Sequence, residues 1–425
     1  MKIRQSSTRW LGLALACGLL TFAVTTQAAK PPKPPPTPTG PAYRIVSLGS
    51  LGGPPVSVSS INEAGQVTGG GHSGDYQSIP FVVTPESSSQ GPVYFRDTSP
   101  ADGINDLIRP LPIPPGARDS WPENINNRGI VAGSYLPPGP DSPYRAMIWA
   151  GETPVDLGIV CAEDTFAFSI NNLGLAVTGP GQWWEIYAPC HVVVPKDSDG
   201  DSAPDTWFED ANADGVNDLL KLVSLPSDYD PVYELWWTLL SPEGINDNGQ
   251  IILDGWQGGG FLLRPDYTDA DGDGNPWYAD TNGDDFNDLL VELIGLGGDD
   301  SYAKDINAAG QVVGSSNKRA VRWDIEPDGR QTATDLGLLS KSVRSMGAAA
   351  INDNGEIVGN ASFTSSRTAF LYKNGKLYDL AAVLTNGTGW EKLSASDINN
   401  QGIIVGSGYL NGVAQGFVAV PVTQP

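Results

Sequence analysis

The sequence predicts an all-β protein, a seven-bladed β-propeller built from four-stranded blades. Three observations lead to this fold class: a hairpin motif recurs seven times, each period holds four short apolar runs, and the chain ends supply complementary parts of one unit. Short antiparallel blades repeated around a ring bury their faces against one another and leave few open sheet edges. We therefore expect the N-terminal strand to complete the last blade and close the ring.

The recurring motif is an Ile-Asn pair, two variable residues, a Gly and then a β-branched run. This order is typical of a tight hairpin in which the Gly adopts a positive φ. Successive motifs are 64, 45, 75, 61, 45 and 47 residues apart, so three units carry insertions. The seven Asn residues are expected to ring one mouth of the channel, and bonds to their own turns explain them without a ligand. They are Asn62, Asn126, Asn171, Asn246, Asn307, Asn352 and Asn399.

Two further apolar runs follow each hairpin and predict the third and fourth strands of a blade. The third strands are expected at residues 80–83, 146–149, 191–194, 261–263, 320–323, 369–372 and 416–420. The fourth is clearest in VDLGIV from Val155, TDLGLL from Thr334 and YDLAAV from Tyr378. In units three and four an extra residue precedes Gly179 and Gly255, which predicts a bulge in the second strand.

The ends of the chain predict how the ring closes. The seventh unit stops at Pro425 without a fourth strand, whereas a strand of the fourth type, YRIVSLGSL, begins at Tyr43 before the first hairpin. A linear solenoid would need a cap at each end, so the unattached strand favours a closed ring. We expect residues 43–51 to pair beside residues 417–420.

The first 41 residues are expected to lie outside the propeller. Residues 1–28 have a basic start, an apolar run at 10–24 too short to span a bilayer, and small residues at the end, which predicts a signal peptide. Residues 29–41 include KPPKPPPTPTGP and form an extended Pro-rich spacer, followed by the propeller at 42–425. The protein is therefore expected to be exported, to the periplasm, the medium or the cell surface, with no transmembrane segment.

The composition excludes several classes of function. With 25 Lys and Arg against 49 Asp and Glu, the net charge of -24 disfavours nucleic acid and anionic lipid as partners. Only two His and three Cys residues leave little material for zinc sites or His-based catalysis. No nucleophile elbow, phosphate loop or Cys-His dyad is evident.

The repeated units resemble the HAF repeats of exported bacterial proteins. The shared features are a DLG strand, an Ala-Ile-Asn-x-x-Gly-x-Val-Val-Gly hairpin and an Ala-Phe strand, which is kept fully only at Ala369-Phe370. The resemblance covers nearly all of the chain after the spacer. It implies export and repetition, and it supplies no catalytic residue.

Asp-rich inserts at 196–218 and 266–288 lie between the third and fourth strands of units three and four, and unit one keeps a fragment, ADGIND, that ends at Asp106. Oxygen ligands at loop positions 1, 3, 5 and 9 suit a hard cation, and these stretches resemble thrombospondin type-3 and dockerin-like calcium loops. The alternative is a set of solvated acidic turns. Trp207 and Trp277 would pack the inserts onto the sheet edge. The candidate calcium ligands are Asp197, Asp199, Asp201, Asp205, Asp210, Asn212, Asp214, Asp218, Asp269, Asp271, Asp273, Asp280, Asn282, Asp284 and Asp288.

Seven tryptophans are expected on the face of the ring opposite the hairpins. A stacking surface of this kind suits sugar rings or another protein, although each Trp could instead cover a blade edge. The candidate ligand-binding residues are Trp121, Trp183, Trp184, Trp236, Trp237, Trp256 and Trp390. In unit three, Cys161 and Cys190 are expected to form a disulfide in an oxidising compartment.

Three functions remain open from the sequence. The first is a monomeric, calcium-stiffened, non-catalytic propeller that binds a glycan or an extracellular protein. The second is an enzyme, hydrolase or lyase, that acts on polysaccharide through paired carboxylates, although no pair can be singled out. The third is a purely structural protein of the cell surface.

Overall fold

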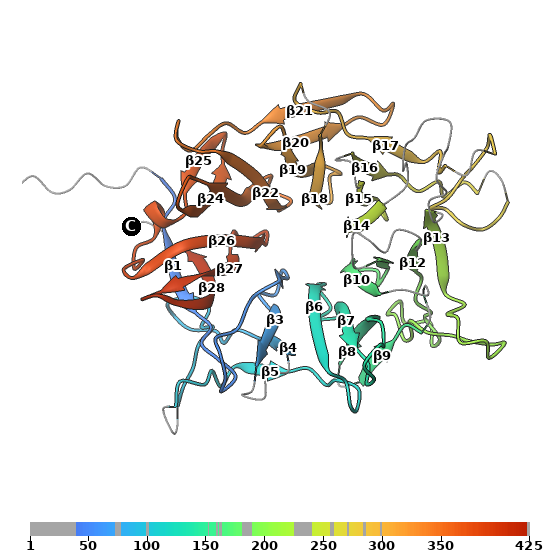
Figure 1. The fold of residues 1–425 in the computed structure, drawn as a ribbon, viewed down its shortest axis with the longest axis horizontal. Helices are drawn as coiled ribbons and strands as arrows, with labels where there is room; N and C mark the ends of the chain where they lie inside the picture. Colours follow the sequence, from blue (N-terminus) through green and yellow to red (C-terminus); the bar gives the residue numbers. More distant parts are fainter. Residues whose placement is uncertain are drawn as a thin grey trace, which may run out of the picture. The chain divides into compact units, whose positions relative to one another are not determined.

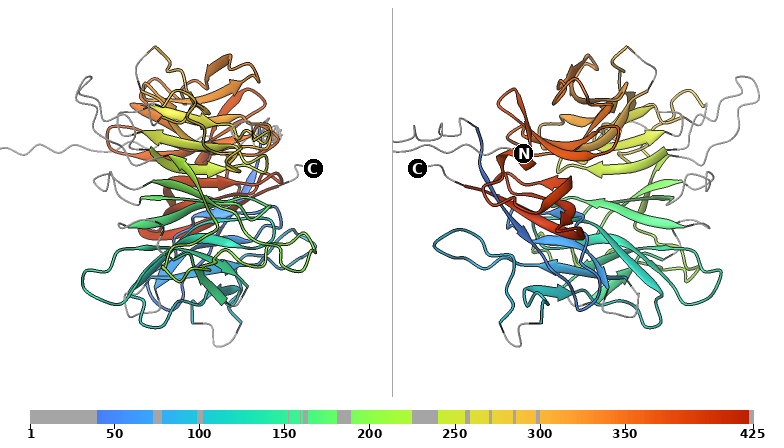
Figure 2. Two further views of the ribbon diagram at one scale, coloured as in Figure 1. Left: turned by 90° about the vertical axis from the view of Figure 1, so that its right-hand side faces the viewer. Right: turned by 60° about the vertical axis from the view of Figure 1, so that its left-hand side comes forward.

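The computed structural model describes residues 40–72, 78–98, 102–151, 153–158, 160, 164–180, 189–224, 240–255, 259–269, 272–283, 286–297 and 300–422. Within this part of the chain it contains seven antiparallel sheets of four strands each, arranged in a ring (Figure 1). The predicted fold class is confirmed. Two side views show strands running along the axis of the ring (Figure 2).

Each of the first six blades is a meander of four consecutive strands, numbered from the axis outward. Blade one holds β2 (Ser60–Ile61), β3 (Val67–His72), β4 (Ser78–Val83) and β5 (Ile108–Pro110); blade two holds β6 (Asp119–Ile125), β7 (Val131–Leu136), β8 (Arg145–Ala150) and β9 (Thr153–Asp156). Blade three holds β10 (Thr165–Ile170), β11 (Ala176–Pro180), β12 (Cys190–Val193) and β13 (Leu220–Ser224); blade four holds β14 (Leu240–Ile245), β15 (Ile251–Gly255), β16 (Gly260–Leu263) and β17 (Leu290–Glu292). Blade five holds β18 (Tyr302–Ile306), β19 (Val312–Ser316), β20 (Arg319–Ile325) and β21 (Gln331–Asp335); blade six holds β22 (Ser345–Ile351), β23 (Ile357–Ser362), β24 (Arg367–Lys373) and β25 (Lys376–Asp379), followed by a short 3-10 helix, η1 (Ala381–Val383).

Blade seven combines both ends of the described chain, as the sequence predicts. Its strands are β26 (Trp390–Ile398), β27 (Ile404–Leu410), β28 (Val413–Pro421) and, outermost, β1 (Tyr43–Ser47). The antiparallel register pairs Ile45 with Ala419 and Val46 with Val418. The N-terminal strand therefore closes the ring, although it ends at Ser47 rather than at residue 51.

The hydrophobic core is divided among the blade interfaces. Seven clusters of buried residues are present among the described residues, and each joins two neighbouring blades. The cluster between blades seven and one, for example, contains Val405 and Val418 from one side and Val67 and Phe81 from the other. Each sheet thus buries both faces, which explains why the predicted strands carry apolar runs.

The hairpins have the predicted geometry. The Gly of every motif has a φ between 72° and 85°, and Gly65, with a φ of 76°, is one example. The predicted bulge before Gly179 and Gly255 is wrong, because β11 and β15 pair with β12 and β16 without a register shift. In the other blades the last Gly of the motif follows the motif Ile by eight residues, and in blades three and four that strand position is occupied by Thr178 and Leu253. Among the described residues, no helix is long and apolar enough to span a membrane.

Candidate functional site: an axial cavity and the insert loops

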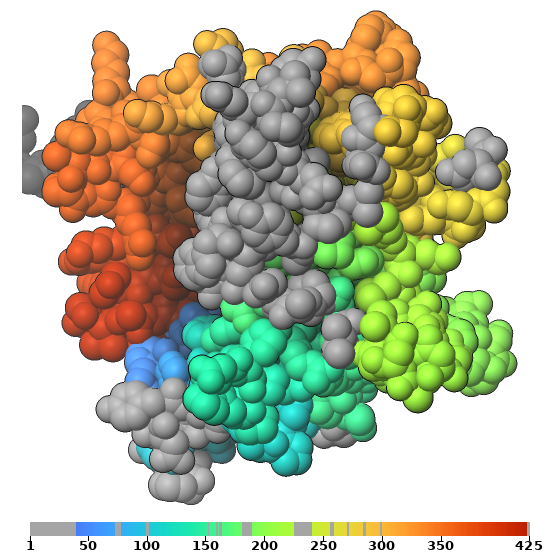
Figure 3. All heavy atoms as spheres, turned by 45° about the vertical axis from the view of Figure 1, so that its right-hand side comes forward, coloured from blue at the N-terminus to red at the C-terminus, as the bar shows by residue number. Residues whose placement is uncertain are grey.

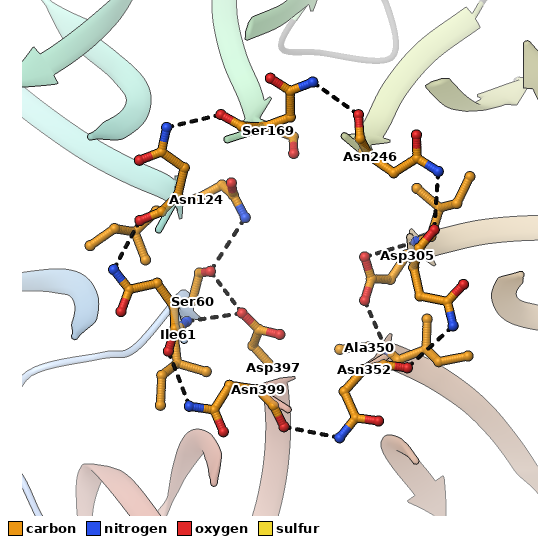
Figure 4. Close-up of a pocket in the computed structure, with 18 of the residues that line it drawn as sticks. Ser60, Ile61, Asn124, Ser169, Asn246, Asp305, Ala350, Asn352, Asp397 and Asn399 are labelled. Atoms are coloured by element: carbon orange, nitrogen blue, oxygen red, sulfur yellow. Dashed lines mark hydrogen bonds between the residues drawn. The ribbon is translucent and has the colours of Figure 1, made fainter. Parts of the chain in front are cut away.

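The seven hairpin Asn residues form a closed circle of hydrogen bonds around the axis. Each Asn side-chain Nδ2 donates to the backbone carbonyl of the corresponding Asn in the next blade, over 2.9 to 3.2 Å, and Asn399 donates to Asn62 (Figure 4). The Oδ1 of each Asn accepts N–H groups of its own turn, as predicted, for example from Gln66. All seven are 5% exposed or less. The circle therefore fixes each turn and also fastens each blade to the next.

A second circle is formed by the residues that follow these Asn residues. The backbone N–H of Glu63 donates to Asn127 Oδ1 over 2.9 Å, and the same bond recurs from blade to blade until Asn400 donates to Glu63. The corresponding bond from Asp247 is missing because its neighbour, Ala308, has no side-chain acceptor. Six of the seven blade interfaces thus carry this second bond, and at the seventh Asn248 Nδ2 donates to the carbonyl of Ala308 over 2.9 Å instead.

The circle of hairpins encloses a polar cavity of about 400 Å³ on the axis. All seven blades contribute to its wall, through the last residues of the innermost strands and the first residues of the turns. Asp305 accepts the N–H of Ile351 over 2.7 Å, and Asp397 accepts the N–H of Ile61 over 2.9 Å, so both carboxylates also bridge blades (Figure 4).

The cavity wall also contains one bulged residue from each innermost strand of blades two to seven. The register shift in these strands leaves a single residue without a partner on the second strand. These residues are Glu123, Phe168, Glu243, Lys304, Ala349 and Ser396, and Ser59 lines the cavity from blade one. Because a bulge re-aims a side chain, it brings these residues to the channel.

The hairpin motif does not predict these bulges, although the strands before it carry a signal for them. In a strand that alternates between two faces, residues an odd number of positions apart point to opposite sides. Ala303 and Ile306 nevertheless pack in the same cluster, between blades four and five, and Ala348 and Ile351 share the cluster between blades five and six, although each pair lies three positions apart. A small buried residue three positions before the motif Ile therefore indicates an inserted residue in the strand.

Several carboxylates of the cavity have raised pKa values. Burial, together with the nearby Glu243 carboxylate, raises the pKa of Glu123 to about 7. Burial also raises the pKa of Glu243, although Lys304 opposes the shift from 2.8 Å away. Burial, assisted by Asp397, raises the pKa of Asp305 to about 7. These carboxylates hold their protons more tightly than in water because desolvation and like charges both disfavour ionisation.

The Lys304 ammonium is the cation among these acids. It pairs with Glu243 Oε2 at 2.8 Å and with Asp254 Oδ2 at 3.5 Å. Burial lowers the pKa of Lys304, but the two carboxylates outweigh this effect and raise it overall. Lys304 therefore offsets one of the two negative charges of Glu243 and Asp254, and the described residues form no ion pair with Glu123.

The acidic inserts leave blades three and four between the third and fourth strands, on the face that carries the hairpins. Their atoms lie at the rim of the ring, shown in green and yellow on the right of the space-filling view (Figure 3). As predicted, their Trp side chains are buried: Trp207 Nε1 donates to Gly174 O over 2.7 Å, and Trp277 Nε1 donates to Gly249 O over 2.9 Å. Each insert is thus anchored to the hairpin glycine of its own blade.

A buried Asn fastens each insert a second time. In blade four, Asn287 donates to the carbonyls of Val223 and Trp277 and accepts the N–H groups of Ala279 and Leu289. Asn217 in blade three and Asn105 in blade one make corresponding bonds and are 2% and 1% exposed. The insert of blade one, predicted as a fragment, is therefore held by the same kind of buried Asn as the two longer inserts.

The loops themselves close through their first and last carboxylates. Asp197 accepts the N–H groups of Gly200 and Ser202, and these bonds lower its pKa. Asp205, Asp218 and Asp288 each accept the N–H of the second loop residue over 2.6 to 2.8 Å. In blade one, Asp106 accepts the N–H of Thr98 over 3.0 Å. The predicted ligand positions thus belong to preformed turns.

One group of predicted calcium ligands comes together among the described residues. Carboxylate oxygens of Asp197, Asp199 and Asp205 lie within 4.8 Å of one another at the surface, and Asp201 is not part of the group. In the second loop, Asn212 and Asp214 instead bond to each other over 3.0 Å. Of the ligands predicted in blade four, Asp271 and Asp284 lie outside the described residues. An oxygen-only, exposed set such as Asp197, Asp199 and Asp205 fits a hard cation whose other ligands are water.

Two of the seven tryptophans predicted to form the aromatic face, Trp121 and Trp390, lie in the described part of the chain. Trp121, on β6, is 37% exposed. Trp390, at the start of β26, packs against the core between blades six and seven and meets the ring of Phe417 edge-on, which fits the alternative of a covered blade edge. Trp183, Trp184, Trp236, Trp237 and Trp256 lie outside the described residues. Cys161 does as well, so its disulfide with the buried Cys190 stays a prediction.

Comparison with known proteins finds only distant structural similarity. Neither a scan against protein-family models nor a search of curated proteins finds a match. A catalytically inactive virginiamycin B lyase from Staphylococcus aureus, solved with quinupristin, is 8% identical with a TM-score of 0.48, covering 89% of this chain and 100% of its own. The beta-propeller domain of the Trilobed protease from Pyrococcus furiosus is 8% identical with a TM-score of 0.41, covering 73% and 85%. TolB from Acinetobacter baumannii is 8% identical with a TM-score of 0.35, covering 66% and 54%. The seven four-stranded sheets of the described chain themselves establish a seven-bladed β-propeller, and its function has to be argued from its own residues.

Proposed function

We propose that this chain is an exported, calcium-stabilised β-propeller that acts as a non-catalytic binding module for a glycan or an extracellular protein. The observation that carries the calcium part is the group of three carboxylates from Asp197, Asp199 and Asp205. Three negative charges at this separation repel one another in water, and a bound divalent cation would turn that repulsion into attraction.

The anchoring of the insert supports a structural role for the cation. Asp197 holds two backbone N–H groups of its loop, and Trp207 fixes the same insert to Gly174. Calcium would take the free lone pairs of Asp197, Asp199 and Asp205 and leave the hairpin circle untouched. It would stiffen the insert of blade three. The insert of blade four, whose Asp residues have a similar spacing, would bind calcium in the same way.

The proposed binding surface is the aromatic face. Its support among the described residues is Trp121, whose side chain is exposed. An indole ring offers a large apolar face and an N–H donor, a combination that suits sugar rings and protein partners. The resemblance to HAF repeats adds export to this proposal.

Calcium dependence is tested by calorimetry of the full chain with calcium and with chelator. We expect chelation to lower the melting temperature by roughly 2 °C or more, since a ligand at a hundred times its dissociation constant stabilises by about 2.7 kcal/mol. Asp205→Asn should lose part of this effect. Asp141→Asn, a change at an exposed acid outside the inserts, is the matched control. An unchanged melting curve together with no bound metal in native mass spectrometry would remove calcium from the proposal.

Binding is tested on a glycan array and with extracellular protein extracts, again with calcium and with chelator. Saturable binding that Trp121→Ala weakens supports the module. Turnover of any polysaccharide would overturn the non-catalytic assignment in favour of the enzyme. Neither binding nor turnover would leave a structural role at the cell surface.

A further inference from the structure

The bulged residues give the axial cavity two unlike walls. The hairpin motif repeats the same Ile, Asn and Gly in every blade, yet the bulge position holds Glu123, Phe168, Glu243 and Lys304 in blades two to five. Blades six, seven and one carry the short side chains Ala349, Ser396 and Ser59 at the same place. Equal backbone geometry does not require such different chemistry. The small side chains leave room opposite a charged and aromatic wall.

The charged wall is unfavourable for the protein by itself. Glu123 faces the like charge of Glu243, and among the described residues no hydrogen bond or ion pair reaches the Glu123 carboxylate. Lys304 is engaged with Glu243 and Asp254, on the other side. Asp305 and Asp397 add negative charge to the same cavity, and they receive only backbone N–H groups and the Ser60 hydroxyl. A bound cation would offset this excess of negative charge.

The arrangement does not suit a metal ion. Among the described residues that line the cavity, no three carboxylates come within 4.8 Å of one another. A divalent cation needs converging oxygen ligands at 2.0 to 2.6 Å, roughly, so spread carboxylates favour a larger cation.

Phe168 indicates which larger cation fits. It lies on the bulge position between the blades of Glu123 and Glu243, with one part packed on the core of blades three and four and another part lining the cavity. Aromatic rings attract organic ammonium groups, and flanking carboxylates add charge to the same contact. A volume of about 400 Å³ accommodates a small molecule rather than a polymer.

We propose that the axial cavity is a binding site for a small organic ammonium compound, held by Glu123 and Glu243 with Phe168 as its apolar contact. Lys304 orients the ligand, because it repels the ammonium group from the side of blade five and directs it toward Glu123. This site is separate from the calcium loops, so the two proposals can fail independently.

Isothermal titration calorimetry on the full chain tests the site, at pH 8, low salt and saturating calcium. The probes are tetramethylammonium and putrescine, which separate a quaternary ammonium from a primary amine. We expect one probe at least to bind with a stoichiometry of one. Glu123→Gln should weaken binding roughly tenfold or more, as expected for the loss of a charged contact. Glu391→Gln removes an exposed acid outside the cavity and should leave binding unchanged.

A second variant tests the site without removing any of the side chains proposed to contact the ligand. Ala349→Lys adds a positive charge to the small wall and should abolish binding of both probes, while its melting curve reports whether the chain still folds. Phe168→Leu should weaken tetramethylammonium more than putrescine. Absence of binding by both probes, equal affinity in Glu123→Gln and wild type, or displacement of the probe by calcium would each overturn the proposal.

Discussion

The side-chain amide of Asn399, in the last hairpin, donates a hydrogen bond over 3.0 Å to the backbone carbonyl of Asn62, in the first. The two residues are 337 positions apart, and their bond completes a circle that passes through all seven blades. The pairing of β1 with β28 closes the ring at its outer edge. The Asn circle closes it again at the axis, so each closure supports the other.

The first prediction concerns this bond. Asn399→Asp keeps the oxygen that accepts the turn N–H groups but replaces the donor with a carboxylate facing a carbonyl. We expect a loss of about 3 kcal/mol in the free energy of unfolding at pH 7. The loss should shrink near pH 4, because the protonated carboxyl can donate again. Asn374→Asp, at an exposed turn, is the control, and equal denaturant midpoints for the two variants would contradict the role of the circle.

The second prediction concerns the outer edge of β1. Asn386 Oδ1 accepts the N–H of Ile45 over 2.8 Å, and Asn386 Nδ2 donates to the carbonyl of Ile45 over 2.9 Å. Asn386→Ala removes both bonds and should destabilise by about 1 to 2 kcal/mol. Hydrogen exchange is the sharper measurement. The Ile45 amide should lose protection while amides of β22 keep theirs, and unchanged protection of Ile45 would show that β1 is held without this clamp.

The third prediction uses the raised pKa of Glu123, which is about 7. A carboxyl with a raised pKa binds its proton more tightly in the folded state, so its contribution lowers stability as the pH rises from about 4.5 to 7. Glu123→Gln should therefore stabilise the ligand-free protein by about 1 kcal/mol at pH 8, a value reduced for water in the cavity. The gain should vanish near pH 4, well below the raised pKa of Glu123, where its carboxyl is protonated. Melting curves of the variant and the wild type between pH 4 and pH 8 measure this gain in stability. A gain that does not change with pH would refute the electrostatic cause.

The fourth prediction concerns the anchor of the blade-three insert. Trp207→Phe keeps an aromatic ring in the buried site but removes the donor to Gly174 O. We expect a destabilisation of about 1 to 2 kcal/mol and weaker calcium binding, because the loop that carries Asp197 and Asp205 would be less well positioned. Trp121→Phe, at an exposed position, is the control and should change neither stability nor calcium affinity. If Trp207→Phe leaves the calcium affinity unchanged, the Trp207 hydrogen bond does not position the calcium loop.

The fifth prediction concerns the close approach of the two inner strands. A Cβ atom at Gly314 would lie 1.8 Å from the backbone oxygen of Tyr302, whereas one at Gly347 meets its nearest atom at 3.6 Å. Gly314→Ala should therefore destabilise by about 3 kcal/mol or more, and Gly347→Ala by far less. Chemical denaturation measures both. Similar midpoints would mean that the strands of blade five move apart at little cost.

The loops show how local patterns predict local geometry. Asn62 bonds to its own turn and Gly65 takes a positive φ, both as the motif predicts, because these contacts span only a few residues. The same holds for Trp207, which reaches the hairpin of its own blade. In the second strands of blades three and four the Gly lies one position later without an inserted residue, so the spacing of Gly alone does not predict a bulge.

The sequence by itself determined the number of blades, the four strands of each and the closure by β1, since repetition and apolar runs record how sheets bury their faces. Only the tertiary structure decided what meets at the axis. The donation from one Asn to the next blade, and the approach of Glu123, Phe168, Glu243 and Lys304, depend on contacts between units 45 to 75 residues apart and on a one-residue bulge in each strand. A bulge reverses the side to which a residue points, so the contents of the cavity follow from strand register and not from strand pattern.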